Sequence, residues 1–301
     1  MAFKTPPLAA LLLTLLTTLT PALALKRSAG CGTTPKLITT ASTTIPLNIT
    51  ANAKARDFFV RLPENYNRDQ PHRLVLTLHA LSGTAEQVIA GTGGYIPWYG
   101  LPPLAAATAA NDTSANTIFV APNGLNNGWA NQGGEDVTFL RAVVAAVEAD
   151  LCVDADRRFA TGFSYGGAMS YALACALGGE IRAVAALSGN PQISGCAGGS
   201  GAVAYYGQHG VGDTVLPITG GREMRDRFLR NNGCAKVDAK DVAEPVSGSG
   251  KRVKTVFAGC KEDKPVVWVA FDGPHTPTPK DAGAAESWVP GETWEFFKQF
   301  K

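Results

Sequence analysis

Short runs of apolar residues recur along the chain, separated by longer stretches in which polar and apolar residues mix. Runs that are almost wholly apolar are typical of strands buried on both faces of a sheet. We expect such strands at 74–78, 118–122, 157–163, 183–187, 203–209 and 266–271. Residues 55–62 alternate instead, and together with the Thr- and Ile-rich residues 36–50 they predict an antiparallel hairpin at a sheet edge.

Between these runs, apolar residues recur at helical spacing. Leu140, Val144 and Val147 fall on one face of a predicted helix over 135–150. Further helices are expected at 168–174, 221–231 and 294–300. Strands that alternate with helices indicate an α/β fold of one domain, with a mostly parallel central sheet flanked by helices. The Gly-rich stretches 91–103, 123–134 and 245–252 are expected to be irregular loops.

The first residues are typical of a secretory leader rather than of a folded domain. Lys4 precedes an apolar run over 8–19, and small residues follow where a signal peptidase would cleave. The run is too short to favour a membrane span. We therefore predict a secreted, extracellular protein with a signal peptide over 1–24, a candidate dibasic pro-segment over 25–27, and an α/β domain over 28–301.

The charge of the chain is nearly balanced, with 27 Lys and Arg residues against 25 Asp and Glu residues. Lys4, Lys26 and Arg27 belong to the leader, so their removal leaves the chain close to neutral. No cluster of basic residues marks a nucleic-acid or membrane surface, and we expect neither partner. The sequence has no CxxC pair and no HExxH pattern, so no metal site and no cofactor are expected.

Six cysteines follow the leader, and an even number in a secreted chain predicts three disulfides. Cys234 and Cys260 flank a Gly/Ser-rich insertion, which favours a bond between them. Cys31 is placed to staple the N-terminal arm, but the sequence does not select its partner. The other candidates are Cys152, Cys175 and Cys196. Asn48 and Asn111 each begin an Asn-x-Thr sequon, which predicts N-glycosylation.

The most informative motif is a serine with glycines two residues away on each side, Gly162, Ser164 and Gly166. An apolar strand precedes it and a helix of small residues follows. A sharp strand-to-helix turn of this kind exposes the serine oxygen, and glycines avoid Cβ clashes around it. The alternative is a purely structural Gly-rich turn, but the strand and helix on either side favour a nucleophile elbow.

A serine hydroxyl is a weak nucleophile unless a base takes its proton. In folds with this elbow, an acid and then a histidine follow the serine, each after a later strand. Asp213 and His275 fit this order. We predict that His275 is the general base and that Asp213 orients its ring, with Asp272 as the competing acid.

The other three histidines are expected to have structural roles. His72 lies in a polar turn and is expected to be solvated. His79 ends a strand and His209 precedes the turn of the acid, so each is expected to fix its loop rather than to transfer protons.

A developing oxyanion requires backbone donors that are already in place. The N–H of Tyr165, next to the nucleophile, is one predicted donor, and the N–H of Leu81, in the loop after strand 74–78, is the other.

Aromatic residues on loops at the expected carboxyl edge of the sheet are candidates for substrate binding, because their rings can stack on a phenolic ring or a sugar. These candidates are Trp98, Tyr99 and Trp129. The alternative is that they pack the loops against the core, as Trp268, Trp288 and Trp294 are expected to do.

Several longer motifs carry a family resemblance. They are Pro97-Trp98-Tyr99-Gly100-Leu101, Ala121-Pro122-Asn123-Gly124-Leu125, Gly128-Trp129-Ala130-Asn131, Gly134-Glu135-Asp136-Val137 and Thr293-Trp294-Glu295-Phe296-Phe297. With the elbow, they resemble secreted fungal feruloyl esterases of carbohydrate esterase family 1, types C and D, which are related to polyhydroxybutyrate-depolymerase-like esterases. The resemblance covers nearly the whole chain after the leader.

The resemblance implies an α/β-hydrolase fold with Ser164, Asp213 and His275 as the catalytic triad. It also implies hydrolysis of esters between hydroxycinnamic acids such as ferulate and plant cell-wall sugars. We expect feruloylated arabinoxylan or pectin fragments as partners, and we expect the protein to be a monomer. Two positions depart from the pattern. Pro274 precedes the base where glycine is more usual, and Ala80 stands where glycine often follows the histidine.

These departures bear on substrate preference more than on the class of reaction. An acetylxylan esterase or a polyester depolymerase would use the same chemistry, and the elbow does not separate them. A protein of another class, a non-catalytic carbohydrate-binding protein on the same fold, is disfavoured by the presence of serine, acid and base in order.

Overall fold

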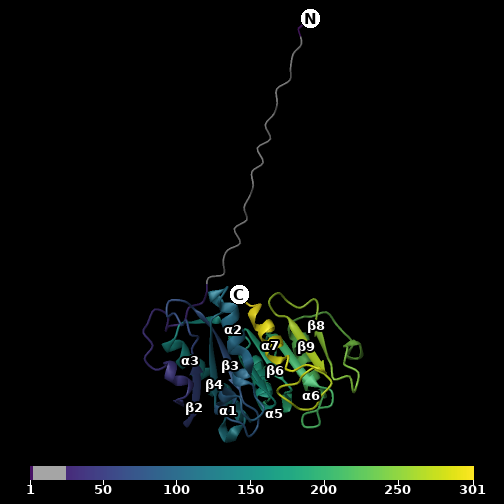
Figure 1. The fold of residues 1–301 in the computed structure, drawn as a ribbon, viewed down its shortest axis with the longest axis horizontal. Coiled ribbons are helices and arrows are strands. Elements are labelled where there is room, and N and C mark those ends of the chain that lie inside the picture. The colour runs from purple at the N-terminus through teal and green to yellow at the C-terminus, as the bar shows by residue number, and fades with distance from the viewer. Residues whose placement is uncertain (3–24) are drawn as a thin grey trace.

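The computed structural model describes residues 1–2 and 25–301, so the predicted signal peptide lies almost entirely outside the described residues. Within the described part, nine strands form one sheet. They are β1 (Leu47–Ala51), β2 (Lys54–Arg61), β3 (His72–Leu78), β4 (Thr117–Pro122), β5 (Val153–Phe163), β6 (Ala183–Leu187), β7 (Ala204–Gly210), β8 (Arg252–Val256) and β9 (Val266–Phe271). Their order across the sheet is β1-β2-β4-β3-β5-β6-β7-β9-β8, with β2 toward one end and β8 toward the other in Figure 1.

The six central strands are parallel, and antiparallel pairs lie at both ends of the sheet. β1 and β2 form the predicted hairpin, β2 also pairs with β4, and β8 runs antiparallel to β9. Parallel pairing carries the sheet from β4 through β3, β5, β6 and β7 to β9. The carboxyl ends of these strands therefore meet at one edge, where α/β proteins bind their ligands.

Helices cover both faces of the sheet. They are α1 (Ala85–Ala90), α2 (Leu101–Ala109), α3 (Glu135–Asp150), α4 (Tyr165–Ala176), α5 (Pro191–Ser194), α6 (Ile218–Asn231) and α7 (Val289–Lys298). The 3-10 turns are η1 (Thr40–Thr43), η2 (Pro97–Gly100), η3 (Thr113–Ala115), η4 (Leu125–Asn127), η5 (Gln132–Gly134) and η6 (Ala239–Asp241). Residues of α3, α4 and α6 join one apolar cluster, and residues of α1, α2 and α7 join the other.

The period of two along each strand explains the two clusters. In β3, Leu74 and Leu76 point into the cluster that contains α3 and α4, whereas Val75 points into the cluster that contains α7. All seven residues of β3 are buried. Because both faces are covered, residues 74–78 of the strand form an almost wholly apolar run in the sequence.

Some predicted elements differ from the structure. Helix α2 begins inside the stretch 91–103, which was expected to be an irregular loop. Strand β8 begins at Arg252, the last residue of the Gly/Ser-rich stretch 245–252. Helix α7 starts at Val289, five residues before the predicted helix. His72 is fully buried rather than solvated, because its Nε2 lies in the turn formed by Asn67, within 3.0 Å of the Asn67 carbonyl oxygen.

Three disulfides fix segments outside the central strands. Cys234 is bonded to Cys260, as predicted, and Cys31 staples the N-terminal arm to Cys152 at the start of β5. The third bond joins Cys175 to Cys196. The arm is also held by its backbone, since the Ser28 N–H donates to the Val153 carbonyl. None of the helices in the described part of the chain is both long enough and apolar enough to span a membrane.

Candidate active site

Ser164 lies at the turn between β5 and α4, in a backbone conformation that side chains rarely adopt. Its φ is 58° and its ψ is −113°. The neighbouring glycines are required by close packing: a Cβ on Gly166 would lie 2.2 Å from the Leu78 carbonyl oxygen, and one on Gly162 would lie 2.6 Å from the Gly166 carbonyl carbon. The Ser164 N–H donates to the carbonyl of Leu187, which fixes the turn to β6. This is the geometry of a nucleophile elbow.

The three residues predicted as a triad lie in hydrogen-bond contact. The Oγ of Ser164 is 2.9 Å from Nε2 of His275, and Nδ1 of His275 is 2.6 Å from Oδ2 of Asp213. Asp213 follows β7, and His275 follows β9. In the tautomer that this geometry requires, Nδ1–H donates to the carboxylate, and the hydroxyl of the serine donates to Nε2. The arrangement can move the serine proton onto the imidazole.

Asp213 is held by four donors. Its Oδ1 accepts from the backbone N–H groups of Val215 and Leu216, at 2.9 and 2.8 Å. Its Oδ2 lies near two histidines, His275 and, at 3.2 Å, Nε2 of His209. Burial acts to raise the pKa of Asp213, but the hydrogen bonds from His209, His275 and Leu216 outweigh it and lower the pKa to about 2. The carboxylate is therefore ionised at neutral pH.

The structure separates the two candidate acids. Oδ2 of Asp272 accepts from the backbone N–H of Gly250 at 2.7 Å and therefore closes a surface turn next to β8 rather than orienting the base. The ring of His275 packs on Phe163, with 4.5 Å between centroids. Pro274 is exposed beside it, so the unusual proline lies at the rim of the site.

The two predicted oxyanion donors lie on neighbouring segments of the structure. Tyr165 is the first residue of α4, and N–H groups of a first helical turn have no partner within the helix. Leu81 lies in the turn after β3. A Cβ on Gly128 would lie 2.9 Å from the ring of Tyr165 and 3.6 Å from Cδ1 of Leu81, so the side chains of Tyr165 and Leu81 flank the same glycine.

The candidate substrate-binding aromatics are placed differently from the prediction. Trp129, Trp98 and Tyr99 are all at most 4% exposed, so they do not offer a ring to a ligand. The Tyr99 hydroxyl donates to the Leu78 carbonyl and accepts from the Phe163 N–H, which ties η2 to the ends of β3 and β5. The Nε1–H of Trp129 donates to the carbonyl of His79. Their side chains therefore pack these loops against the core, which is the alternative that the sequence left open.

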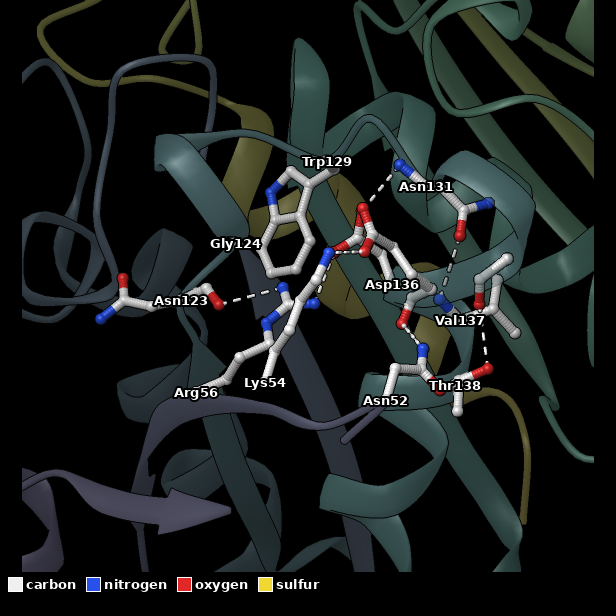
Figure 2. Close-up of polar contacts among 12 residues, drawn as sticks. Asn52, Lys54, Arg56, Asn123, Gly124, Trp129, Asn131, Asp136, Val137 and Thr138 are labelled. Carbon is white, nitrogen blue, oxygen red and sulfur yellow. Dashed lines mark hydrogen bonds and ion pairs between the residues drawn. The ribbon is translucent and has the colours of Figure 1, made fainter. Parts of the chain in front are cut away.

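Sequence reasoning missed a buried ion pair behind the site. A guanidinium nitrogen of Arg56 lies 2.7 Å from Oδ1 of Asp136, and both side chains are almost inaccessible to solvent. The guanidinium also lies 3.7 Å from the ring centroid of Phe139. Figure 2 shows Arg56 and Asp136 meeting beneath Trp129. In the sequence, Asp136 belongs to the predicted helix over 135–150 and to one of the family motifs, and no local pattern links it to Arg56 on β2.

The elbow after β5 and the acid and base after β7 and β9 place the chain among the α/β-hydrolases. Among the residues that the structure describes, no group of His, Cys, Asp and Glu side chains is arranged to hold a metal ion.

Comparison with known proteins identifies the family within the α/β-hydrolases. The chain is 46% identical to feruloyl esterase D of Neurospora crassa over 96% of each chain, and 46% identical to feruloyl esterase C of Emericella nidulans over 90% of each. It belongs to the family of fungal feruloyl esterases C and D. No family model matches it. Acetyl xylan esterase from Aspergillus awamori has the same fold, with a TM-score of 0.57 at 16% identity over 84% of this chain and 99% of that one.

Proposed function

We propose that the protein is a secreted serine esterase that releases ferulic and related hydroxycinnamic acids from plant cell-wall polysaccharides. Its substrates are feruloylated arabinoxylan or pectin fragments, and it acts as a monomer through the domain at 28–301 that remains after the leader is removed. The observation that carries this proposal is the contact of Ser164 with His275 and of His275 with Asp213, in a chain that is 46% identical to a feruloyl esterase.

The reaction follows from the positions of these groups. His275 takes the proton of Ser164 as the serine oxygen attacks the ester carbonyl, and the resulting oxyanion accepts hydrogen bonds from the N–H groups of Tyr165 and Leu81. His275 then gives the proton to the ester oxygen of the sugar as the bond between this oxygen and the acyl carbon breaks, so that the sugar leaves as an alcohol and the acyl group stays on Ser164. A water molecule, deprotonated by His275, releases the hydroxycinnamate and restores the serine. Asp213 stabilises the imidazolium at both steps.

Replacement of the nucleophile tests the mechanism. We expect Ser164→Ala to lower kcat on methyl ferulate by about 10⁶-fold, because the covalent step is lost. The matched control, Ser247→Ala, changes an exposed serine in the Gly/Ser-rich segment and should keep full activity. Unchanged hydrolysis by Ser164→Ala would refute the mechanism.

The acyl group is tested by product release from wheat bran and from matched methyl esters, with ferulate and acetate measured together. We expect the protein to release ferulate in preference to acetate. Release of acetate without ferulate would assign the chain to acetyl esters, and absence of any hydrolysis by the unaltered protein would favour a carbohydrate-binding role.

A further inference from the structure

The turn that follows β3 leaves one amide free. The N–H of Ala80 donates to the Tyr95 hydroxyl at 2.7 Å, that of Ser82 donates to the Asn127 carbonyl at 2.8 Å, and that of Gly83 donates to the Ala80 carbonyl at 3.1 Å. Within residues 25–301, the N–H of Leu81 has no acceptor. A turn that satisfies every neighbouring amide and leaves this one unpaired presents a donor to an incoming oxyanion.

The direction of that donor is set through the other end of the same peptide unit. In a trans peptide, the carbonyl of Ala80 and the N–H of Leu81 point in opposite directions within one plane. The Ala80 carbonyl accepts from Nδ1 of His79 at 2.8 Å as well as from the N–H of Gly83. Fixing this oxygen therefore fixes the direction of the Leu81 N–H.

The contacts of His79 determine its protonation. Nδ1 faces a carbonyl oxygen, so it must carry a proton. Nε2 accepts a hydrogen bond from the backbone N–H of Gly124 at 2.9 Å, so it must be unprotonated. The ring is fully buried, and burial lowers the pKa of His79, with Arg56 acting in the same direction more weakly than the burial. Only the neutral Nδ1–H form satisfies both contacts, since a second proton would face the Gly124 N–H.

A buried layer holds the backbone and ring of His79 in place. The indole Nε1–H of Trp129 donates to the His79 carbonyl at 2.9 Å, and the two rings lie 4.8 Å apart. The loop that carries Trp129 is fixed in turn by Asp136, whose Oδ2 accepts from the N–H of Asn131 at 2.7 Å. Arg56 joins Asp136 to the Asn123 carbonyl, one residue before Gly124, as Figure 2 shows.

From these contacts we propose that His79 is a positioning residue, which aims the Leu81 N–H at the oxyanion through the Ala80 carbonyl. The inference rests on the proposed esterase function. It assigns to the motif around Trp129, Asn131 and Asp136 the role of holding this histidine. The histidine itself moves no proton in the reaction.

The two nitrogens of His79 can be tested separately. His79→Asn places an amide N–H donor near the position of Nδ1 and can keep the bond to the Ala80 carbonyl, whereas His79→Gln reaches the position of Nε2 and loses that bond. We expect His79→Gln to lower kcat about 10- to 100-fold with little change in KM, because removal of a whole oxyanion donor costs about 10²–10³ in kcat. His79→Asn should stay within about 3-fold of the unaltered protein, on the same scale.

Thermal unfolding of both variants shows whether they fold. If both fold and lose kcat equally, or if His79→Gln keeps its kcat, the inference is wrong. Nitrogen NMR of the unaltered protein gives an independent test that needs no variant and no substrate: His79 must be neutral and protonated on Nδ1 at pH 6–7. A proton on Nε2 would overturn the inference.

These outcomes are separable from failure of the proposed function. kcat is measured on whichever ester, methyl ferulate or the matched acetate, the unaltered protein hydrolyses. If it hydrolyses neither, the proposed function fails while the tautomer of His79 can still be measured. If it hydrolyses one and His79→Gln does so equally well, only the positioning role fails.

Discussion

The segments on the two sides of Ser164, the turn of Leu81 and the loop of His275, are held in place by different kinds of contact. On the side of the proposed oxyanion donor Leu81, here called the oxyanion side, the turn is supported by buried polar side chains. These side chains also belong to the packed core, and they are His79, Trp129, Arg56 and Asp136. On the base side, His275 lies on an irregular loop after β9 and is anchored mainly by one carboxylate, Asp213. A change on the first side should disturb stability and activity together, whereas a change on the second should lower activity much more than stability.

The largest expected effect is on the base side. Asp213→Asn keeps the size of the side chain but removes the charge that stabilises the imidazolium and selects its tautomer. We expect kcat/KM on methyl ferulate to fall about 10⁴-fold, with the midpoint of thermal unfolding at pH 7 changed by only a few degrees. Esterase assays and calorimetry of the same preparation measure both. A large loss of stability with only a modest loss of activity in Asp213→Asn would contradict the expectation that the base side governs activity more than stability.

The next effect is on the oxyanion side. Arg56→Met removes one partner of the buried pair and leaves Asp136 charged and enclosed, so we expect the free energy of unfolding to fall by about 3–5 kcal/mol. The matched control is Lys54→Met, because Lys54 forms a solvent-exposed pair with Glu135 on the same strand and helix. The control should cost less than about 1 kcal/mol.

Denaturant unfolding of both variants measures the difference in their free energies of unfolding. The kcat of the folded fraction tests whether stability and activity are linked on this side. Equal losses in Arg56→Met and Lys54→Met would show that the buried pair does not support this side. Lost stability with unchanged kcat would show that the pair supports the core but not the oxyanion turn.

The smallest expected effect is the pH dependence of the contribution that Asp213, on the base side, makes to the free energy of unfolding. The pKa of Asp213 is lowered from 3.8 to about 2 in the folded protein. Between these values the unfolded chain binds more protons than the folded one, so this group's contribution is present above about pH 4 and is lost as the pH falls through 2. The difference in unfolding free energy between the unaltered protein and Asp213→Asn should therefore shrink from pH 5 to pH 2. A constant difference would mean that Asp213 has an ordinary pKa.

Much of the fold could be predicted from the sequence, because β3, β4, β6 and β9 are buried on both faces and contain runs that are almost wholly apolar. Strand β8 was missed because it is an edge strand with Arg252, Lys254 and Thr255 along it, so neither length nor hydrophobicity marks it. Helix α2 was missed because two prolines open it and its alanines form no apolar stripe.

The site shows a similar division. Ser164, Asp213 and His275 could be ordered from the sequence because each follows a recognisable strand, and the structure brings them together. The inward packing of Trp98, Tyr99 and Trp129 could not be predicted, since an irregular loop has no period that tells which side chain faces the core. The pairing of Arg56 with Asp136 is a contact between distant segments, and neither residue has a local signature.

The separation of the triad along the chain has a consequence for how the protein folds. Ser164 and His275 are 111 residues apart, and β6, β7 and β9 must all be paired before they can touch. Contacts of such long range form slowly, and parallel pairing is especially slow. Recovery of esterase activity after dilution from denaturant should therefore lag behind the return of helical circular dichroism. The rate at which activity returns would then report the rate at which the parallel strands finish pairing.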